Sequence, residues 1–304
     1  MTLSHGHTET FQGFDVEVNA PLSRYTSFRV GGPADVLARP ESVDTLIALL
    51  KTARKSNVPV TVLGGGSNTL VTDTGIRGLV IVLTALKNDL QFVEDDGVIS
   101  LTAMAGDRLG KLCRTAADKG FSGLEWAAGI PGTLGGAIIM NAGSHGSDMA
   151  AIVSSVDVLD SETLEVSTLN AADLNFSYRH LDLDGRIILG ATLTLTSADK
   201  DQVKSAFEAN LKAKNASQPV SKASGGCFFK NPSPDKPAGW LIEQAGCKGT
   251  THRGAMVSDL HANFIVNHDN ADCSDILALA TKVKEIVFEK FNIKLEAEVK
   301  TIGD

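Results

Sequence analysis

The chain has 304 residues, 43% of them hydrophobic, so it can bury cores in two or three lobes. Its formal net charge of −8, from 28 Lys plus Arg against 36 Asp plus Glu, offers no general attraction to nucleic acid or to an anionic membrane. We expect a folded globular protein with no nucleic-acid partner, in which loops and single basic residues would hold any phosphate group.

Cysteine usage and hydropathy narrow the setting further. The four cysteines, Cys113, Cys227, Cys247 and Cys273, are far apart and form neither a C-x-x-C pair nor a zinc-type spacing. The sequence therefore predicts no metal site, no disulfide framework and a reducing, cytoplasmic location. The N-terminal segment MTLSHGHTETFQGFDVEV lacks a basic region followed by an apolar stretch, and no later run reaches the roughly 18 apolar residues of a membrane span, so we expect no membrane insertion.

The first strongly patterned elements are a helix, a strand and a glycine loop. Apolar residues recur at helical spacing within 41–55, and VPVTVL at 58–63 is typical of a buried strand. The loop that follows consists of Gly64, Gly65, Gly66, Ser67 and Asn68. Glycines in this place let successive backbone N–H groups face one anion, and the last two side chains add hydrogen-bond donors. The loop is therefore either a phosphate site or a tight turn.

The middle of the chain is rich in predicted strands and contains a second glycine loop. The predicted elements are strands at 78–86 and 97–106, a helix at 107–120, a hairpin at 152–169 and a strand at 186–197. Between them, residues 129–143 (GIPGTLGGAIIMNAG) carry five glycines and almost no charge, a composition that permits close backbone approach to a large, flat ligand. Because neither loop matches G-x-G-x-x-G or G-x-x-x-x-G-K-[ST], a Rossmann fold and a P-loop are disfavoured.

The last third mixes helices and short strands around an unusual cysteine. The predicted elements are helices at 198–217, 238–246 and 272–291 and strands at 261–267 and 294–303. The mixed order of elements predicts an α+β fold, with lobes expected at 1–85, 86–199 and 200–304. In SGGCFFKNP, Cys227 stands between two glycines and two phenylalanines, which leaves open whether it packs, binds a metal, forms a disulfide or does chemistry.

Seven ordered motifs together resemble the bacterial UDP-N-acetylenolpyruvoylglucosamine reductases, in the shorter subtype of that family. The motifs are YTSFRVGGPAD, LGGGSNTLV, GIPGTLGGAIIMNAG, SYRHLDL, GGCFFKNP, HRGAMVSDLHANFIVN and LEAEVKTIG. The resemblance implies a two-part FAD-binding domain of the vanillyl-alcohol-oxidase (PCMH) type, followed by a smaller C-terminal α+β domain that binds a UDP-sugar. It also implies NADPH-dependent reduction of UDP-N-acetylglucosamine enolpyruvate to UDP-N-acetylmuramate for peptidoglycan synthesis, with no obligate protein partner.

The resemblance implies that the first glycine loop holds the FAD pyrophosphate and that the second lines the cofactor. The residues expected to contact FAD are Gly64, Gly65, Gly66, Ser67, Asn68, Gly129, Ile130, Pro131, Gly132, Thr133, Gly135, Gly136 and Asn141. No histidine or cysteine that could tether a flavin lies within either loop, although His145 follows the second one.

Three residues are implied to be catalytic. Arg179 in SYRHLDL matches the family's active-site arginine, whose guanidinium suits a carboxylate that gains charge as an enolate; without the resemblance it would pass as a surface cation. Glu298 matches the glutamate that polarises or protonates the enolate, with Glu296 as the local alternative. Cys227 stands where many members have a serine proton donor. A thiol with an ordinary pKa of about 8.5 can donate a proton and is open to alkylation, although a buried structural cysteine is the alternative.

The expected substrate contacts come from Tyr178, Lys230, Asn231 and Asn263. Tyr178 would position the substrate, and Asn263 would bind uracil or a phosphate. Lys230 and Asn231 would contact the substrate or NADPH, with a merely solvated position as the alternative. His261 is taken as structural. Members of the family often carry a basic residue two positions before Pro219, where this chain has Ser217. Lys214 or Lys222 could take its place.

Two other functions remain open at this stage. An oxidase of the same flavoprotein fold would act on an alcohol or lactone, and it would need a different base and commonly a covalent flavin tether. A non-catalytic sensor of UDP-sugars or nucleotides is supported only by the cysteine-for-serine change, and the intact Arg179 and Glu298 speak against it.

Overall fold

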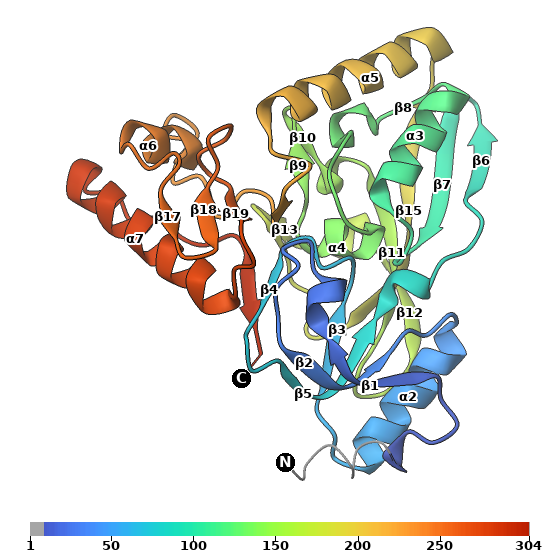
Figure 1. The fold of residues 1–304 in the computed structure, drawn as a ribbon. Helices are drawn as coiled ribbons and strands as arrows, with labels where there is room; N and C mark the ends of the chain where they lie inside the picture. Colours follow the sequence, from blue (N-terminus) through green and yellow to red (C-terminus); the bar gives the residue numbers. More distant parts are fainter. Residues whose placement is uncertain (1–8, 304) are drawn as a thin grey trace.

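Residues 9–303 are described by the computed structural model, and they form three lobes, each built on its own sheet (Figure 1). The predicted absence of a membrane-inserting N-terminus falls partly outside this range, on residues 1–8. None of the helices within the described range combines the length and the apolar character needed to cross a membrane.

The first lobe is a four-stranded sheet with one long helix. The strand order is β1-β2-β5-β3, in which the first pair is antiparallel and the other two pairs are parallel. The elements are β1 (Val16–Pro21), β2 (Pro33–Ala38), α2 (Val43–Lys55), β3 (Val60–Leu63) and β5 (Ile76–Val82). Ser42 caps the N-terminus of α2, and its side chain accepts a 3.2 Å hydrogen bond from the backbone N–H of Thr45. The first glycine loop leaves the end of β3, as predicted.

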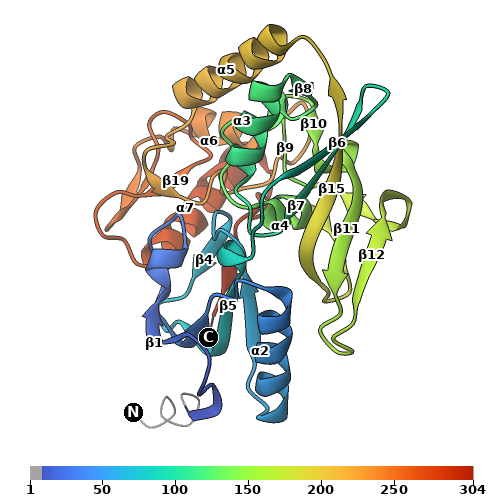
Figure 2. The same ribbon diagram turned by 90° about the vertical axis from the view of Figure 1, so that its right-hand side faces the viewer.

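The second lobe is an antiparallel sheet of order β12-β11-β15-β7-β6, with β8 paired to β15. Its strands are β6 (Gln91–Asp95), β7 (Val98–Met104), β8 (Phe121–Ser122), β11 (Val153–Leu159), β12 (Val166–Asn170) and β15 (Ile187–Ser197). Strands β11 and β12 form the predicted hairpin. Helices α3 (Leu109–Lys119) and α4 (Leu134–Ile139) lie on the side of this sheet that faces the rest of the molecule (Figure 2). The second glycine loop runs into α4.

Helix α5 (Lys200–Ser217) packs on the second lobe (Figure 1). Val203 and Phe207 are buried in the same apolar cluster as Cys113 of α3, and Asn210 Nδ2 donates a 2.9 Å hydrogen bond to the carbonyl of Glu125. The core of the second lobe therefore extends past residue 199, because the apolar side of this charge-laced helix needs a partner surface. The expected division into 1–85, 86–199 and 200–304 stays a prediction.

The third lobe is a four-stranded antiparallel sheet of order β16-β19-β18-β17 with two helices. Its elements are β16 (Ala223–Ser224), α6 (Ala238–Gln244), β17 (Thr251–His252), β18 (Ala255–Val257), β19 (Ile265–Asn267) and α7 (Cys273–Phe291). The strand predicted at 261–267 is shorter, since the backbone N–H of Phe264 bonds the carbonyl of His261 in a turn. His261 and Asn263 thus precede the strand rather than lie on it.

The end of the chain returns to the first lobe (Figure 1 and Figure 2). Strand β20 (Lys300–Ile302) pairs in parallel with β4 (Thr69–Val71), which directly follows the first glycine loop. The strand predicted at 294–303 is therefore mostly irregular, apart from β20 and one bridge between Ala297 and Phe229. This return places the residues before β20 beside both glycine loops.

Candidate active site

The two glycine loops pack directly on each other. A Cβ on Gly65 would lie 3.0 Å from Cα of Gly132, and a Cβ on Gly132 would lie 2.5 Å from Oγ of Ser67. A Cβ on Gly64 would approach Oγ1 of Thr133 to 2.9 Å. That hydroxyl is buried and has no hydrogen-bond partner among residues 9–303. Buried polar atoms normally have partners, so the pair of loops forms a cradle suited to a polar ligand.

Short antiparallel pairing brings Glu298 next to the segment that carries Cys227. The backbone N–H of Glu298 donates to the carbonyl of Phe228 at 2.8 Å, and the N–H of Lys230 donates to the carbonyl of Glu296 at 2.9 Å. The side chains of Lys230 and Glu296 also form an ion pair at 3.8 Å. Glu298 is mostly buried whereas Glu296 is exposed, so the structure separates the two glutamates that sequence left as alternatives.

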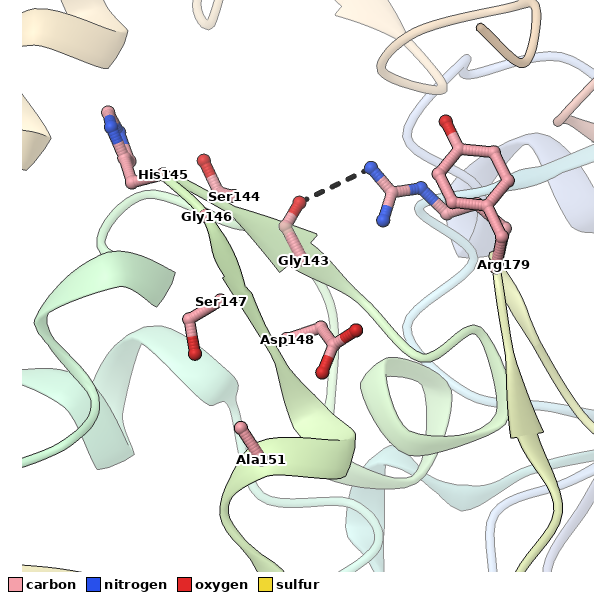
Figure 3. A pocket seen from close by; sticks show the side chains of 9 residues that line it. Gly143, Ser144, His145, Gly146, Ser147, Asp148, Ala151 and Arg179 are labelled. Atoms are coloured by element: carbon pink, nitrogen blue, oxygen red, sulfur yellow. Dashed lines mark hydrogen bonds between the residues drawn. The ribbon is translucent and has the colours of Figure 1, made fainter. Parts of the chain in front are cut away.

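Arg179 reaches Glu298 from the second lobe. It lies in the turn between β13 (Phe176–Ser177) and β14 (His180–Leu181), with a φ of 58° that is uncommon for a residue other than glycine. Its Nε donates to Oε1 of Glu298 at 2.9 Å, and its Nη2 donates to the carbonyl of Gly143 at 3.3 Å, as Figure 3 shows for the second bond. Backbone strain of this kind is characteristic of functional sites.

Cys227 is a protonated thiol in this environment. Burial raises the pKa of the Cys227 thiol to about 12, and the nearby Glu298 carboxylate adds to the rise. The cations of Arg179 and Lys214 oppose it. The thiolate, which is the form that alkylating reagents attack, is therefore rare at neutral pH. The expected sensitivity of this position to alkylation stays a prediction, and the raised pKa of the thiol would slow that reaction at neutral pH.

Lys214 is a charged neighbour that comes from α5. A Cβ on Gly129 would lie 3.0 Å from Cδ of Lys214, so the absence of a side chain at Gly129 makes room for the lysine stem. Burial lowers the pKa of Lys214, interaction with Cys227 raises it, and interaction with Arg179 lowers it. The hydroxyl of Ser217 is bonded back to the carbonyl of Ala213 at 2.9 Å.

An open pocket of about 390 Å³ adjoins Arg179 (Figure 3). It is lined by Gly143, Ser144, His145, Gly146, Ser147, Asp148, Ala151, Tyr178 and Arg179. The ribbon formed by β9 (Gly143–Ser144) and β10 (Ser147–Asp148) supplies most of this wall. A substrate that reaches the guanidinium can therefore extend into solvent along the ribbon.

Known proteins match the chain over nearly its whole length. One family model, an FAD binding domain, covers residues 34–168, and the C-terminal domain model of UDP-N-acetylenolpyruvoylglucosamine reductase covers 218–302. The UDP-N-acetylenolpyruvoylglucosamine reductase of Caldanaerobacter subterraneus is 42% identical over 94% of this chain and 93% of its own length, and that of Bacillus subtilis is 41% identical over 95% and 94%. The chain belongs to this reductase family. The solved reductase of Thermus caldophilus matches it with a TM-score of 0.78 and 34% identity, covering 94% of this chain and 98% of that one.

Family membership confirms the predicted fold class, the reductase activity and the use of FAD and NADPH, and it gives the oxidase alternative no support. The glycine loops fit FAD, because its pyrophosphate needs backbone N–H groups without Cβ atoms in the way and a polar partner such as the unpaired Thr133 hydroxyl. A side chain at Gly65 or Gly132 would crowd the opposite loop, against Cα of Gly132 or Oγ of Ser67 respectively.

Two predicted cofactor residues, Asn141 and Asn68, use their side-chain amides to bond other segments of the chain. Asn141 is buried, and its amide nitrogen donates to Asp148 at 3.2 Å and to the carbonyl of Ser177 at 3.1 Å. It therefore supports the turn that presents Arg179. The amide of Asn68 donates to the backbone carbonyl of Glu298 at 3.1 Å.

The predicted substrate residues separate into two groups. Asn263 is buried, and its side chain both accepts from the N–H of Phe229 at 2.9 Å and donates to the carbonyl of Phe229 at 2.8 Å, so it holds the segment next to Cys227. Asn231 accepts from the N–H of Ala238 at 3.0 Å, at the start of α6. Tyr178 is exposed at the pocket, with its ring 5.1 Å from the guanidinium carbon of Arg179.

Replacing Glu298 with glutamine should raise the melting temperature at pH 7 by roughly 1–3 °C. Burial raises the pKa of Glu298 even though Arg179 opposes the rise, so ionisation costs the folded state more than the unfolded state. Stability is then lost as pH rises above the ordinary glutamate pKa, and a neutral isostere avoids that loss. Melting curves of both proteins should converge below about pH 4. A variant that is less stable at pH 7 would show that the Arg179 ion pair outweighs burial.

Proposed function

We propose that Arg179, Cys227 and Glu298 carry out the reduction of UDP-N-acetylglucosamine enolpyruvate to UDP-N-acetylmuramate in this chain. The observation that supports this proposal best is their convergence: a turn of the second lobe, a loop of the third and the segment before the terminal strand meet beside the glycine loops. FAD held by the two glycine loops would supply hydride transfer, from NADPH to the alkene carbon remote from the carboxylate. The chain's own residues must then handle the negative charge and the proton.

Arg179 is proposed to bind the substrate carboxylate. Two of its three nitrogens are fixed by Glu298 and Gly143, which sets the plane of the guanidinium. Within the described part of the chain no hydrogen bond uses Nη1, which leaves it for an incoming oxygen. As charge develops on the enolate, a fixed cation stabilises it without reorganisation.

Cys227 is proposed to protonate the carbon that bears the carboxylate. The thiol gives up its proton, and the sulfur keeps the electron pair of the S–H bond. Because the pKa of the thiol is raised to about 12, the acid is present throughout the neutral range. The cations of Arg179 and Lys214 lie near the thiolate formed in this step and lower its free energy.

The remaining contacts complete the proposal. Glu298 orients Arg179 and polarises the enolate, and Lys214 replaces the basic residue missing at position 217 as the partner of a substrate or NADPH phosphate. Lys230 is partly exposed and Asn231 is exposed, and both are proposed to meet the substrate or NADPH. Tyr178 is proposed to stack beside the substrate at the pocket. The proposed location is the cytoplasm, with a small-molecule UDP-sugar as substrate.

The two half-reactions can be watched separately in the absence of oxygen. Adding NADPH to the purified holoenzyme should bleach the visible flavin absorbance, and adding UDP-N-acetylglucosamine enolpyruvate should restore it. Flavin that bleaches but recovers only in air would contradict the reductase reaction, as would a protein that binds no flavin. UDP-N-acetylglucosamine is a matched control, because it has no alkene to reduce and should restore nothing.

A further inference from the structure

Hydrogen bonds connect the first glycine loop to the segment that carries Glu298 and, through Ser27, to the segment that carries Cys227. On one side, the backbone carbonyl of Asn68 accepts from the backbone N–H of Lys300 at 3.0 Å, while its side-chain amide nitrogen donates to the backbone carbonyl of Glu298 at 3.1 Å. Asn68 thus forms hydrogen bonds to the backbone of both neighbours of Val299. The side-chain bond of Asn68 thus holds the backbone of Glu298, from which the carboxylate projects toward Arg179.

On the other side, Ser27 connects the same loop to the Cys227 segment. Its backbone N–H donates to the carbonyl of Gly66 at 3.0 Å, and its hydroxyl donates to the carbonyl of Ser224 at 2.6 Å. Ser224 lies three residues before Cys227. Ser27 therefore bridges the loop and the strand from which the thiol segment departs.

Residues 25–28 pack tightly against the glycines of both segments. A Cβ on Gly66 would lie 2.0 Å from the carbonyl oxygen of Tyr25, and a Cβ on Gly225 would lie 2.3 Å from the ring of Phe28. Residues 25–28 thus pack between the two segments, through the backbone of Tyr25 against Gly66 and through the ring of Phe28 against Gly225. A small displacement of the loop has to be passed on to the Cys227 segment, because packed interiors have little free volume.

We propose that Ser27 and Asn68 are positioning residues for the second half-reaction, which set the thiol of Cys227 and the carboxylate of Glu298 according to the conformation of the first glycine loop. A diphosphate bound in the loop fixes Gly66 and Asn68, and these contacts fix the two proton-handling segments. An occupied cofactor loop would then hold the acid and the carboxylate in their reactive positions. This inference rests on the roles proposed above for Cys227 and Glu298.

The test compares S27A and N68A with controls that lose the same kind of bond elsewhere. S154A removes a 2.9 Å hydroxyl bond to the carbonyl of Thr192, and N210A removes the amide bond to the carbonyl of Glu125. In FAD-loaded protein under anaerobic conditions, S27A and N68A should slow reoxidation by the enolpyruvyl substrate roughly tenfold, with flavin reduction by NADPH within about twofold of wild type. The effect should fall on kcat more than on KM for the substrate, and the controls should behave as wild type.

A second readout does not depend on turnover. Amide hydrogen exchange in 224–229 and 298–302 should slow when FAD is added to the apoprotein, and this protection should be lost from the first segment in S27A and from the second in N68A. Equal protection in wild type and variants, or a loss confined to FAD affinity with both loaded half-reactions intact, would overturn the inference. If C227A and E298Q themselves reoxidise at the wild-type rate, the catalytic assignments fail instead.

Discussion

Replacing Cys227 with alanine should slow reoxidation of the reduced flavin by UDP-N-acetylglucosamine enolpyruvate by roughly 10²–10⁴-fold, the usual contribution of a general acid. The variant removes the proton but leaves both glycine loops and the Arg179–Glu298 pair in place. Reduction by NADPH should therefore stay within about twofold of wild type. Rapid mixing of pre-reduced enzyme with substrate, without oxygen, measures the two steps separately.

C113A is the matched control for this experiment. Burial also raises the pKa of the Cys113 thiol to about 12, and Lys214 is among its charged neighbours, but Cys113 lies in the core of the second lobe. It should reoxidise as fast as wild type, while C227S should retain more activity than C227A because a hydroxyl can still donate a proton. Since the wild-type thiol stays protonated, its rate should not fall between pH 7 and pH 9 through loss of this proton. An alanine variant that reoxidises normally would remove Cys227 from the mechanism.

The elements that sequence predicts well are those whose partners lie nearby in the chain. Helices α2, α3 and α7 show their buried side every three or four residues, and each has a local stop or start signal, such as Gly120 after α3 or Asp272 before α7. The β11–β12 hairpin is likewise predicted by its alternation of apolar and polar residues and by its short turn. Their bounds are set by local chemistry, and the structure changes them by only a few residues.

The terminal strand could not be predicted in the same way, because its partners are distant. Residues 294–303 alternate like a strand, yet only Lys300–Ile302 pair with β4, and the residues before them bond to Phe228 and Lys230 instead. Alternation alone places Glu296 and Glu298 on one face. The difference between them, one exposed and one buried against Arg179, arises from contacts with two other lobes.

Polar side chains show the same limit for the site. Asn141, Asn263 and Asn68 stand in motifs that sequence associates with ligands, but all three use their amides to hold backbone segments of the chain. A motif reveals that a residue matters, and not whether it touches the ligand or fixes a neighbour. Ser27 was missed altogether, although it lies inside the motif YTSFRVGGPAD, because its partners lie 39 and 197 residues away.

Arg179→Lys should lower the rate of reoxidation by the enolpyruvyl substrate by roughly 10²–10³-fold, although it preserves the positive charge. A single ammonium cannot reproduce the fork that bonds Glu298 through Nε and Gly143 through Nη2 while presenting a further nitrogen to the substrate. The positive charge of the lysine still attracts the carboxylate. The affinity of the oxidised enzyme for the substrate should therefore fall by a much smaller factor than the rate of reoxidation. Titration of flavin absorbance and single-turnover kinetics give the two quantities.

Arg186→Lys provides the corresponding control. Arg186 also lies in the second lobe and pairs with carboxylates of Asp160 at 3.9 Å and Asp184 at 3.6 Å, but these contacts are more exposed and lie outside the site. Exposed ion pairs contribute little, so this variant should keep the wild-type rate and stability. If Arg179→Lys reoxidises as fast as this control, stabilisation of the enolate depends on charge only and the fixed guanidinium geometry is not what the reaction requires. The pairing of Arg179 with Glu298 predicts a large loss in Arg179→Lys and none in Arg186→Lys. Only at Arg179 does the planar guanidinium set the position of the positive charge that stabilises the enolate.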